Sequence, residues 1–254
     1  MKLRLILPML AAVLAAGCFE EEKPAPSPAP AEKPDKPAEA PKPAVGKRTA
    51  MNKNKTLYLE TFDDGKKRVI IEAAVCLREG PLELLLCRKQ TKEHEAVLHA
   101  DINAADVHTV LVLTKAKAGS PVRWQPEYKP ASGTTIKIWL EYKNKKGEMV
   151  TVAANEWVRN FRTRKQLESD WVFAGSRFFR DPEDPKKEPY YMANNGDVIS
   201  VANFPDSMLD LPIQSSKENA DLSFETWTER IPDVGTKVNV ILEPVIEEEK
   251  KDKK

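Results

Sequence analysis

Alternating apolar and polar positions dominate the central part of the chain and predict β-strands. Between 69 and 77, apolar residues occupy every position of one alternating set, as expected for a strand with one buried face; they are Val69, Ile71, Ala73, Val75 and Leu77. Residues 56–61 precede it, and the Asp-Asp-Gly turn at 63–65 predicts that the two segments form a hairpin. After a Glu-Gly-Pro turn at 79–81, residues 82–87 predict another strand that returns alongside 69–77.

Further strand patterns occupy the C-terminal half. Residues 134–142 alternate, turn at a Lys-Gly pair and return through 149–153, which predicts a second hairpin. Residues 190–193 and 197–203 bracket an Asn-Asn-Gly turn and predict a third. Single strands are expected at 170–175, 222–227 and 237–243.

Helical periodicity is confined to one well-bounded segment. Asp101 or Asn103 can cap its N-terminus, an apolar stripe begins at Val107, and Gly119 follows its end. Residues 155–169 could form a second, short helix with a thin apolar stripe. The expected fold class is therefore α+β, a β-rich single domain of antiparallel hairpins with one or two helices.

The N-terminus has the pattern of an export signal. Residues 1–17 combine a positive start with an apolar run that is much shorter than the ~20 residues of a membrane-spanning helix. The Leu-Ala-Ala-Gly-Cys segment that ends at Cys18 resembles the lipobox of bacterial lipoproteins, which implies lipidation of Cys18. An ordinary secretory signal with an incidental cysteine is the alternative. Under either interpretation the domain is exported, and lipidation would hold it in the bacterial cell envelope, facing the periplasm or exterior.

Composition separates the folded part from its ends. Pro, Ala, Lys and Glu fill residues 18–51, the composition of a disordered tether that begins at the lipidated cysteine. Residues 247–254 form a charged tail. A single domain is thus expected at 52–246.

The charge balance narrows the class of partner. The chain has 40 Lys and Arg residues and 39 Asp and Glu residues, for a formal net charge of +1. A nucleic-acid-binding protein usually shows a clustered basic excess, so no nucleic-acid partner is expected. The expected partners are the membrane, through the lipid anchor, and a protein or small molecule.

Several separated blocks of the chain resemble the YdjY-type domain. In order, the blocks are Val75-Cys76-Leu77, Gly80-Pro81-Leu82-Glu83, Lys92-Glu93-His94-Glu95, Glu156-Trp157-Val158, Asp170-Trp171-Val172-Phe173-Ala174-Gly175-Ser176 and Gly235-Thr236-Lys237-Val238. The resemblance covers roughly 55–245 and implies an exported, often lipid-anchored bacterial protein, but it implies no activity. Some members are described as ferredoxin-like. An iron–sulfur cluster needs about four thiolates and the domain has only two cysteines, so neither a cluster nor another cofactor is expected.

Cys76 and Cys87 admit three interpretations. If 69–77 and 82–87 pair directly, both sulfurs lie on one side, and a disulfide that closes a loop of about twelve residues would contribute roughly 2–3 kcal/mol. Two buried free thiols are the second interpretation. A redox-active pair is the third, although the usual C-x-x-C spacing is missing. We favour the disulfide.

The histidines suggest a candidate metal site. His94 and His99 are five residues apart, whereas the zinc-protease motif has a spacing of four, so they cannot share an ion on a helix or a strand. Glu95, His99 and Asp101 share one strand face, and the helix could bring His108 to them, as a metal-dependent hydrolase would require. Polar side chains that are solvated or hydrogen-bonded near a helix cap are the alternative.

Trp139 lies on the polar side of its predicted strand, where a large apolar ring needs cover. That cover comes from the same domain or from an external ligand, in which case Trp139 marks a ligand surface. Ser176 lacks the second glycine of a nucleophile elbow, and no other catalytic pattern stands out. The sequence therefore predicts a lipid-anchored binding or interaction module, with a metal-dependent hydrolase in the His94 to His108 region as the alternative.

Overall fold

The computed structural model describes residues 46–217 and 222–246. The predicted signal peptide, Cys18, nearly all of the predicted tether and the predicted tail lie outside the described residues. The described part contains one α-helix, α1 (Ala104–Leu113). Its strands are β1 (Lys47–Ala50), β2 (Leu57–Thr61), β3 (Lys67–Val75), β4 (Pro81–Leu82), β5 (Leu84–Arg88), β6 (Ala96–Ala100), β7 (Ala118–Ser120), β8 (Ser132–Gly133), β9 (Thr135–Lys143), β10 (Met149–Ala153), β11 (Val158–Asn160), β12 (Trp171–Phe173), β13 (Phe178–Phe179), β14 (Tyr190–Tyr191), β15 (Ile199–Ser200), β16 (Leu209–Asp210), β17 (Phe224–Thr226) and β18 (Lys237–Pro244).

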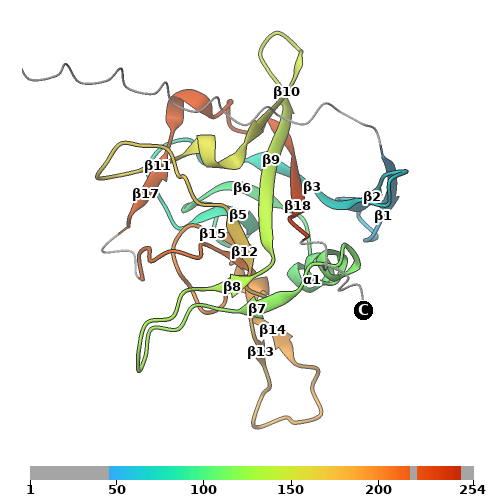
Figure 1. The fold of residues 1–254 in the computed structure, drawn as a ribbon, viewed down its shortest axis with the longest axis vertical. Coiled ribbons are helices and arrows are strands. Elements are labelled where there is room, and N and C mark those ends of the chain that lie inside the picture. Colours follow the sequence, from blue (N-terminus) through green and yellow to red (C-terminus); the bar gives the residue numbers. More distant parts are fainter. Residues whose placement is uncertain (1–45, 218–221, 247–254) are drawn as a thin grey trace, which may run out of the picture. The chain divides into compact units, whose positions relative to one another are not determined.

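Eight of these strands close into a mixed β-barrel (Figure 1). The ring runs β3, β18, β9, β12, β16, β15, β5 and β6, and β6 pairs back onto β3. Neighbours are antiparallel except for the parallel pairs β5 with β6 and β15 with β16. β2 and then β1 extend outward from β3, and β10 extends from β9. Closure stabilises the domain because the first and last strands of the ring hydrogen-bond to each other. In an open sheet, the backbone N–H and C=O groups along these edges would have no partner strand.

Apolar side chains at alternate strand positions fill the barrel. On β3, Val69, Ile71 and Val75 are buried in the main core, as the alternation predicts. α1 buries Val107 and Val110 in the same core. Each large aliphatic side chain buried in this way contributes about 1.5–3 kcal/mol relative to exposure, so core burial is the main stabilising term.

Predictions that concern chain neighbours are confirmed. β2 and β3 form the first hairpin, and β9 and β10 form the second. Asn103 caps α1, with its side chain accepting a hydrogen bond from the backbone N–H of Ala105 at 2.8 Å. The β-rich single domain with one helix is confirmed, whereas residues 155–169 form only a short 3₁₀ turn at Ala154–Trp157 followed by β11. None of the helices in the described part is long and apolar enough to cross a membrane.

Two predicted strand pairings are wrong. β6 lies between β3 and β5, antiparallel to the first and parallel to the second, so 82–87 does not pair with 69–77. Ala96, Val97 and Leu98 are all fully buried, and a continuous apolar run of this kind needs cover on both faces, as an interior strand has. The third predicted hairpin does not form either, because β14 pairs with β13 while β15 pairs with β5 and β16. In addition, β1 begins at Lys47, within the predicted tether, and pairs with β2.

Candidate functional site

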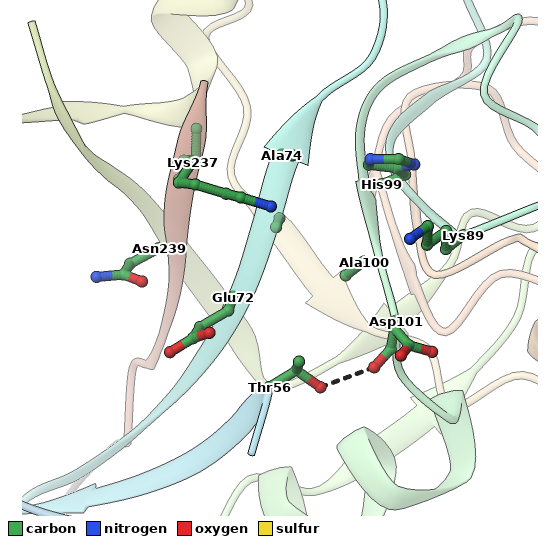
Figure 2. A pocket seen from close by; sticks show the side chains of 11 residues that line it. Thr56, Glu72, Ala74, Lys89, His99, Ala100, Asp101, Lys237 and Asn239 are labelled. Carbon is green, nitrogen blue, oxygen red and sulfur yellow. Dashed lines mark hydrogen bonds between the residues drawn. The ribbon is translucent and has the colours of Figure 1, made fainter. Parts of the chain in front are cut away.

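A hollow opens on the outside of the barrel where β3 changes partners. Along one edge, β3 pairs with β2 from Lys67 to Ile71 and then with β6 at Ala74 and Val75. The space between these two pairings has a volume of about 390 Å³ and is called the β2–β6 hollow here (Figure 2). It is lined by Thr56, Glu72, Ala73, Ala74, Lys89, His99, Ala100, Asp101, Lys237, Val238 and Asn239.

Small side chains make room for the β2–β6 hollow, and charged side chains surround it. Ala73, Ala74 and Ala100 are buried beneath it and fill little space. Figure 2 shows Lys237 extending from β18 past Ala74, while Asp101 lies on the opposite side. The lining thus brings two lysines and a histidine to the same space as two carboxylates, so opposite charges face one hollow.

Hydrogen bonds hold the acidic end of the β2–β6 hollow in place. The Thr56 hydroxyl donates to the backbone oxygen of Asp101 at 2.7 Å, and Asn54 Nδ2 donates to Asp101 Oδ2 at 3.0 Å. The Glu72 N–H donates to the backbone oxygen of Thr56 at 2.8 Å and joins β3 to the start of β2. The carboxylate of Asp101 is therefore oriented by neighbours from another part of the chain.

The four predicted metal ligands do not come together. His99 and Asp101 both line the β2–β6 hollow, but Glu95 points to Lys92, with Oε1 3.3 Å from the ammonium nitrogen. His108 faces Tyr191 instead. Within residues 46–217 and 222–246, no group of three or more His, Cys, Asp or Glu side chains is arranged to hold a metal ion. In this structure, strand and helix direct two members of the predicted quartet to other partners.

His108 belongs to a packed aromatic cluster. Its Nδ1 lies 2.9 Å from the Tyr191 hydroxyl, which donates its proton to the backbone oxygen of Gly175 at 2.9 Å, so Nδ1–H is the donor to Tyr191. The imidazole packs edge-on against Phe173, with ring centroids 4.8 Å apart. Burial lowers the pKa of His108. The neutral imidazole thus acts as a packing and hydrogen-bonding element.

A carboxylate cluster that the sequence did not reveal surrounds Lys92. The Lys92 ammonium lies 3.0 Å from Asp197 Oδ1, 3.3 Å from Glu95 Oε1 and 3.7 Å from Glu83 Oε2. Glu83 is 2 % exposed, and no donor in the described part of the chain reaches its Oε1. Burial, together with contact with Glu95, raises the pKa of Glu83 to about 7. Three carboxyl groups thus depend on one ammonium group for charge compensation.

Asp210 on β16 is a second buried acid. It is 0 % exposed, and its Oδ1 accepts hydrogen bonds from Asn203 Nδ2 at 3.0 Å and from the Leu211 N–H at 2.7 Å. Among the described residues, neither Asp210 Oδ2 nor the Tyr128 hydroxyl has a hydrogen-bond partner. Burial raises the pKa of Asp210 to about 8, against the lowering effect of the two hydrogen bonds. At neutral pH this side chain is therefore mainly the uncharged acid.

Cys76 directly follows β3 and Cys87 lies on β5. β6 runs between these two strands, and both residues are free cysteines. The hairpin pairing on which the disulfide prediction depended is therefore not formed. The thiols still influence each other: contact with Cys87, together with burial, raises the pKa of Cys76, and contact with Cys76 lowers the pKa of Cys87.

Trp139 is covered by its own domain. It is 8 % exposed and packs against Ile70 and Ile241 in a small apolar cluster, separate from the main core. Its Nε1 donates to Glu243 Oε2 at 2.9 Å, which satisfies the indole N–H. The cover for this ring therefore comes from its own domain, and the ring stabilises the pairing of β9 with β18.

The described chain is thus a β-barrel domain with one helix and a polar, mixed-charge hollow on its outer surface. The family model for the YdjY domain matches residues 61–243, so the chain belongs to the YdjY domain family. The match covers the closed ring except for the last residue of β18, and it confirms the family resemblance of the sequence. Searches of curated proteins and of solved structures gave no match.

Proposed function

We propose that this protein is a binding module of the bacterial cell envelope, anchored through lipidated Cys18, and that the β2–β6 hollow receives a small zwitterionic ligand. The observation that carries the proposal is the placement of Lys89 and Lys237 together with Glu72 and Asp101 around one hollow. The metal-dependent hydrolase receives no comparable support, because Glu95 and His108 point to other partners.

The charges suggest how such a ligand would lie. The lysines suit a carboxylate, and the two acids suit an ammonium group at the other end of the same molecule. A volume of about 390 Å³ lies within the ~300–1,000 Å³ typical of small-molecule sites. Because the charged groups are solvated, each ion pair would contribute at most about 1 kcal/mol. The affinity should therefore be modest and should depend on salt concentration.

Triglycine is a suitable probe because it has both terminal charges and can be capped. We expect the full chain to bind triglycine, and to bind N-acetyl-triglycine amide at least ~10-fold more weakly, which corresponds to about 1.4 kcal/mol. Calorimetric or NMR titration measures both affinities. Lys237→Gln should weaken triglycine binding, whereas Lys143→Gln, an exposed lysine of β9 outside the β2–β6 hollow, should leave it unchanged. Equal affinity for the two peptides, no binding of either, or equal effects of the two variants would refute the proposal.

Anchoring is tested separately. Cys18→Ser removes the sulfur that lipidation would modify, so the variant should move from the membrane fraction to the soluble envelope fraction. Fractionation followed by immunoblotting measures the shift, and Cys76→Ser provides a control that leaves Cys18 intact. Retention of the Cys18→Ser protein in the membrane fraction would contradict lipid anchoring at this position.

A further inference from the structure

Two cysteines approach β6 from opposite sides: Cys76 directly follows β3, and Cys87 lies on β5. The Cys76 N–H donates to the backbone oxygen of Val97 at 2.9 Å, and the Cys76 thiol donates to the backbone oxygen of Ala96 at 3.1 Å. The Cys76 side chain therefore leans across β6. From the other side, Cys87 is paired with His99, is 0 % exposed and packs against Ala96. Both sulfur atoms are thus close to the same residue of the intervening strand.

The backbone spacing suits a bridge that is longer than a disulfide. Strands on either side of a third strand are two spacings apart, roughly 9–10 Å, and Cys76 beside Val97 lies two residues along β6 from Cys87 beside His99, which lengthens the separation further. A disulfide usually requires Cα atoms about 4.4–6.8 Å apart and joins sulfur atoms at about 2 Å. A metal ion bound between two thiolates holds the sulfur atoms roughly 4–5 Å apart, because two metal–sulfur bonds of about 2.3 Å each lie between them. A bridging ion therefore needs less movement of β3 and β5 than a disulfide does.

The number of ligands selects the kind of metal. A structural zinc site needs four ligands, and the part of the chain that the structure describes offers no group of three. Soft thiolates favour Cu(I), which is stable with two ligands in a line. Leu84 and Ala96 pack against Cys87, which is 0 % exposed, so its sulfur is shielded from solvent. We propose that Cys76 and Cys87 form a two-coordinate site for Cu(I), in addition to the proposed ligand site in the β2–β6 hollow.

The binding step balances without a redox partner. Both S–H bonds break, two Cu–S bonds form, and the two protons pass to solvent, while copper stays Cu(I) and the sulfurs stay thiolates. The product has one net negative charge. Glu93, which is hydrogen-bonded to His99, opposes this charge build-up next to both thiols. Because protons are released, copper affinity should rise with pH.

The test is a competition for Cu(I) under anaerobic conditions. The full chain is used with Cys18→Ser, so that only Cys76 and Cys87 remain, and the fully reduced protein is titrated into the coloured Cu(I)–bicinchoninate complex. We expect loss of colour equivalent to about one copper per chain and X-ray absorption with two sulfur neighbours per copper. Adding Cys76→Ser or Cys87→Ser should weaken binding by more than the ~10–100-fold that loss of a supporting residue costs. His94→Ala, at an exposed histidine, is the matched control and should bind normally.

Other results would overturn the site. Failure of the reduced chain to remove copper from the competitor would contradict the copper site. Unchanged copper binding by Cys76→Ser would contradict it too; Cys76 is only half-buried, so this variant is the one expected to fold normally. Equally tight 1:1 binding of Zn²⁺ would show additional ligands and contradict two-coordinate binding. Thiol titration of the protein isolated without reductant checks the remaining rival: two unreactive sulfurs that a mild reductant releases would establish the disulfide in place of the copper site.

Discussion

Replacing Asp210 by Asn should stabilise the protein, although it removes a hydrogen-bonded carboxyl group. Asp210 is 0 % exposed, and burial raises its pKa to about 8. Folding at neutral pH therefore requires an acid that is ionised in the unfolded chain to take up a proton. Asn is already neutral, and its Oδ1 can keep the bonds from Asn203 and Leu211. Its amide nitrogen replaces Oδ2, and Tyr128, a hydroxyl whose pKa Asp210 helps to raise, is a nearby acceptor.

The size of the effect follows from proton linkage. With a pKa of about 3.9 in the unfolded chain and about 8 in the folded one, the cost of proton uptake at pH 7 has a ceiling of about 4 kcal/mol. Relaxation around a buried charge reduces such costs, so we expect the Asn variant to be more stable by about 2 kcal/mol at pH 7. For a domain of this size, that gain corresponds to an increase of about 4–8 °C in Tm.

The pH dependence has a definite sign. Because the pKa of Asp210 is higher in the folded state than in the unfolded chain, its contribution to the free energy of unfolding is fully present below pH ~4. This contribution is lost as the pH rises towards 8. Urea unfolding of wild type and Asp210→Asn at pH 4.5, 7 and 8.5 should therefore give a stability difference that grows with pH. Asp184→Asn, in an exposed loop, is the control. If Asp210→Asn is less stable than wild type at pH 7 by an amount that does not change with pH, Asp210 is an ionised, stabilising acceptor and the reasoning is wrong.

Two further substitutions test the packing and electrostatics. Lys92→Met should lower the free energy of unfolding by about 3–5 kcal/mol, because Asp197 and its neighbours lose their counter-ion. Chemical denaturation measures this loss, with Lys89→Met as the exposed control. Equal losses of stability in the two variants would contradict the proposed role of Lys92 in the carboxylate cluster. Trp139→Ala should lower the free energy of unfolding by about 3–5 kcal/mol because it removes a buried ring, whereas triglycine binding should persist. An unchanged Tm, or loss of triglycine binding by a folded variant, would contradict a purely structural role of Trp139.

Predictions of strands and turns succeeded where partners are close in the chain. The first hairpin follows from alternation on both sides of the Asp-Asp-Gly turn, and Asn103 caps α1 as its position before the apolar stripe indicates. The Asn-Asn-Gly segment shows the limit. Gly196 has the positive φ of 127° that the segment favours, but it ends a 3₁₀ turn at Met192–Asn195 rather than joining paired strands. A turn sequence specifies backbone angles, but not the strands that it connects.

The same limit applies to the candidate sites. His99 and Asp101 are two residues apart, so strand periodicity places them on one face, and both line the β2–β6 hollow. Lys92 and Asp197 are 105 residues apart, and no local pattern relates them. Cys76 and Cys87 are close in sequence, but their relation depends on β6, which comes later in the chain.

The sequence by itself determined the family, the β-rich class, the position of α1 and most strand segments, because these depend on local periodicity, turn chemistry and the order of short sequence blocks along one chain. Only the tertiary structure decided that the strands close into a barrel, that β6 separates the cysteines, that Trp139 is covered and that Lys92 neutralises buried acids. These features depend on which distant segments bury one another. The apolar face of one strand can be buried against the apolar face of many others. Which strands pair is therefore decided only when all strands of the domain pack together.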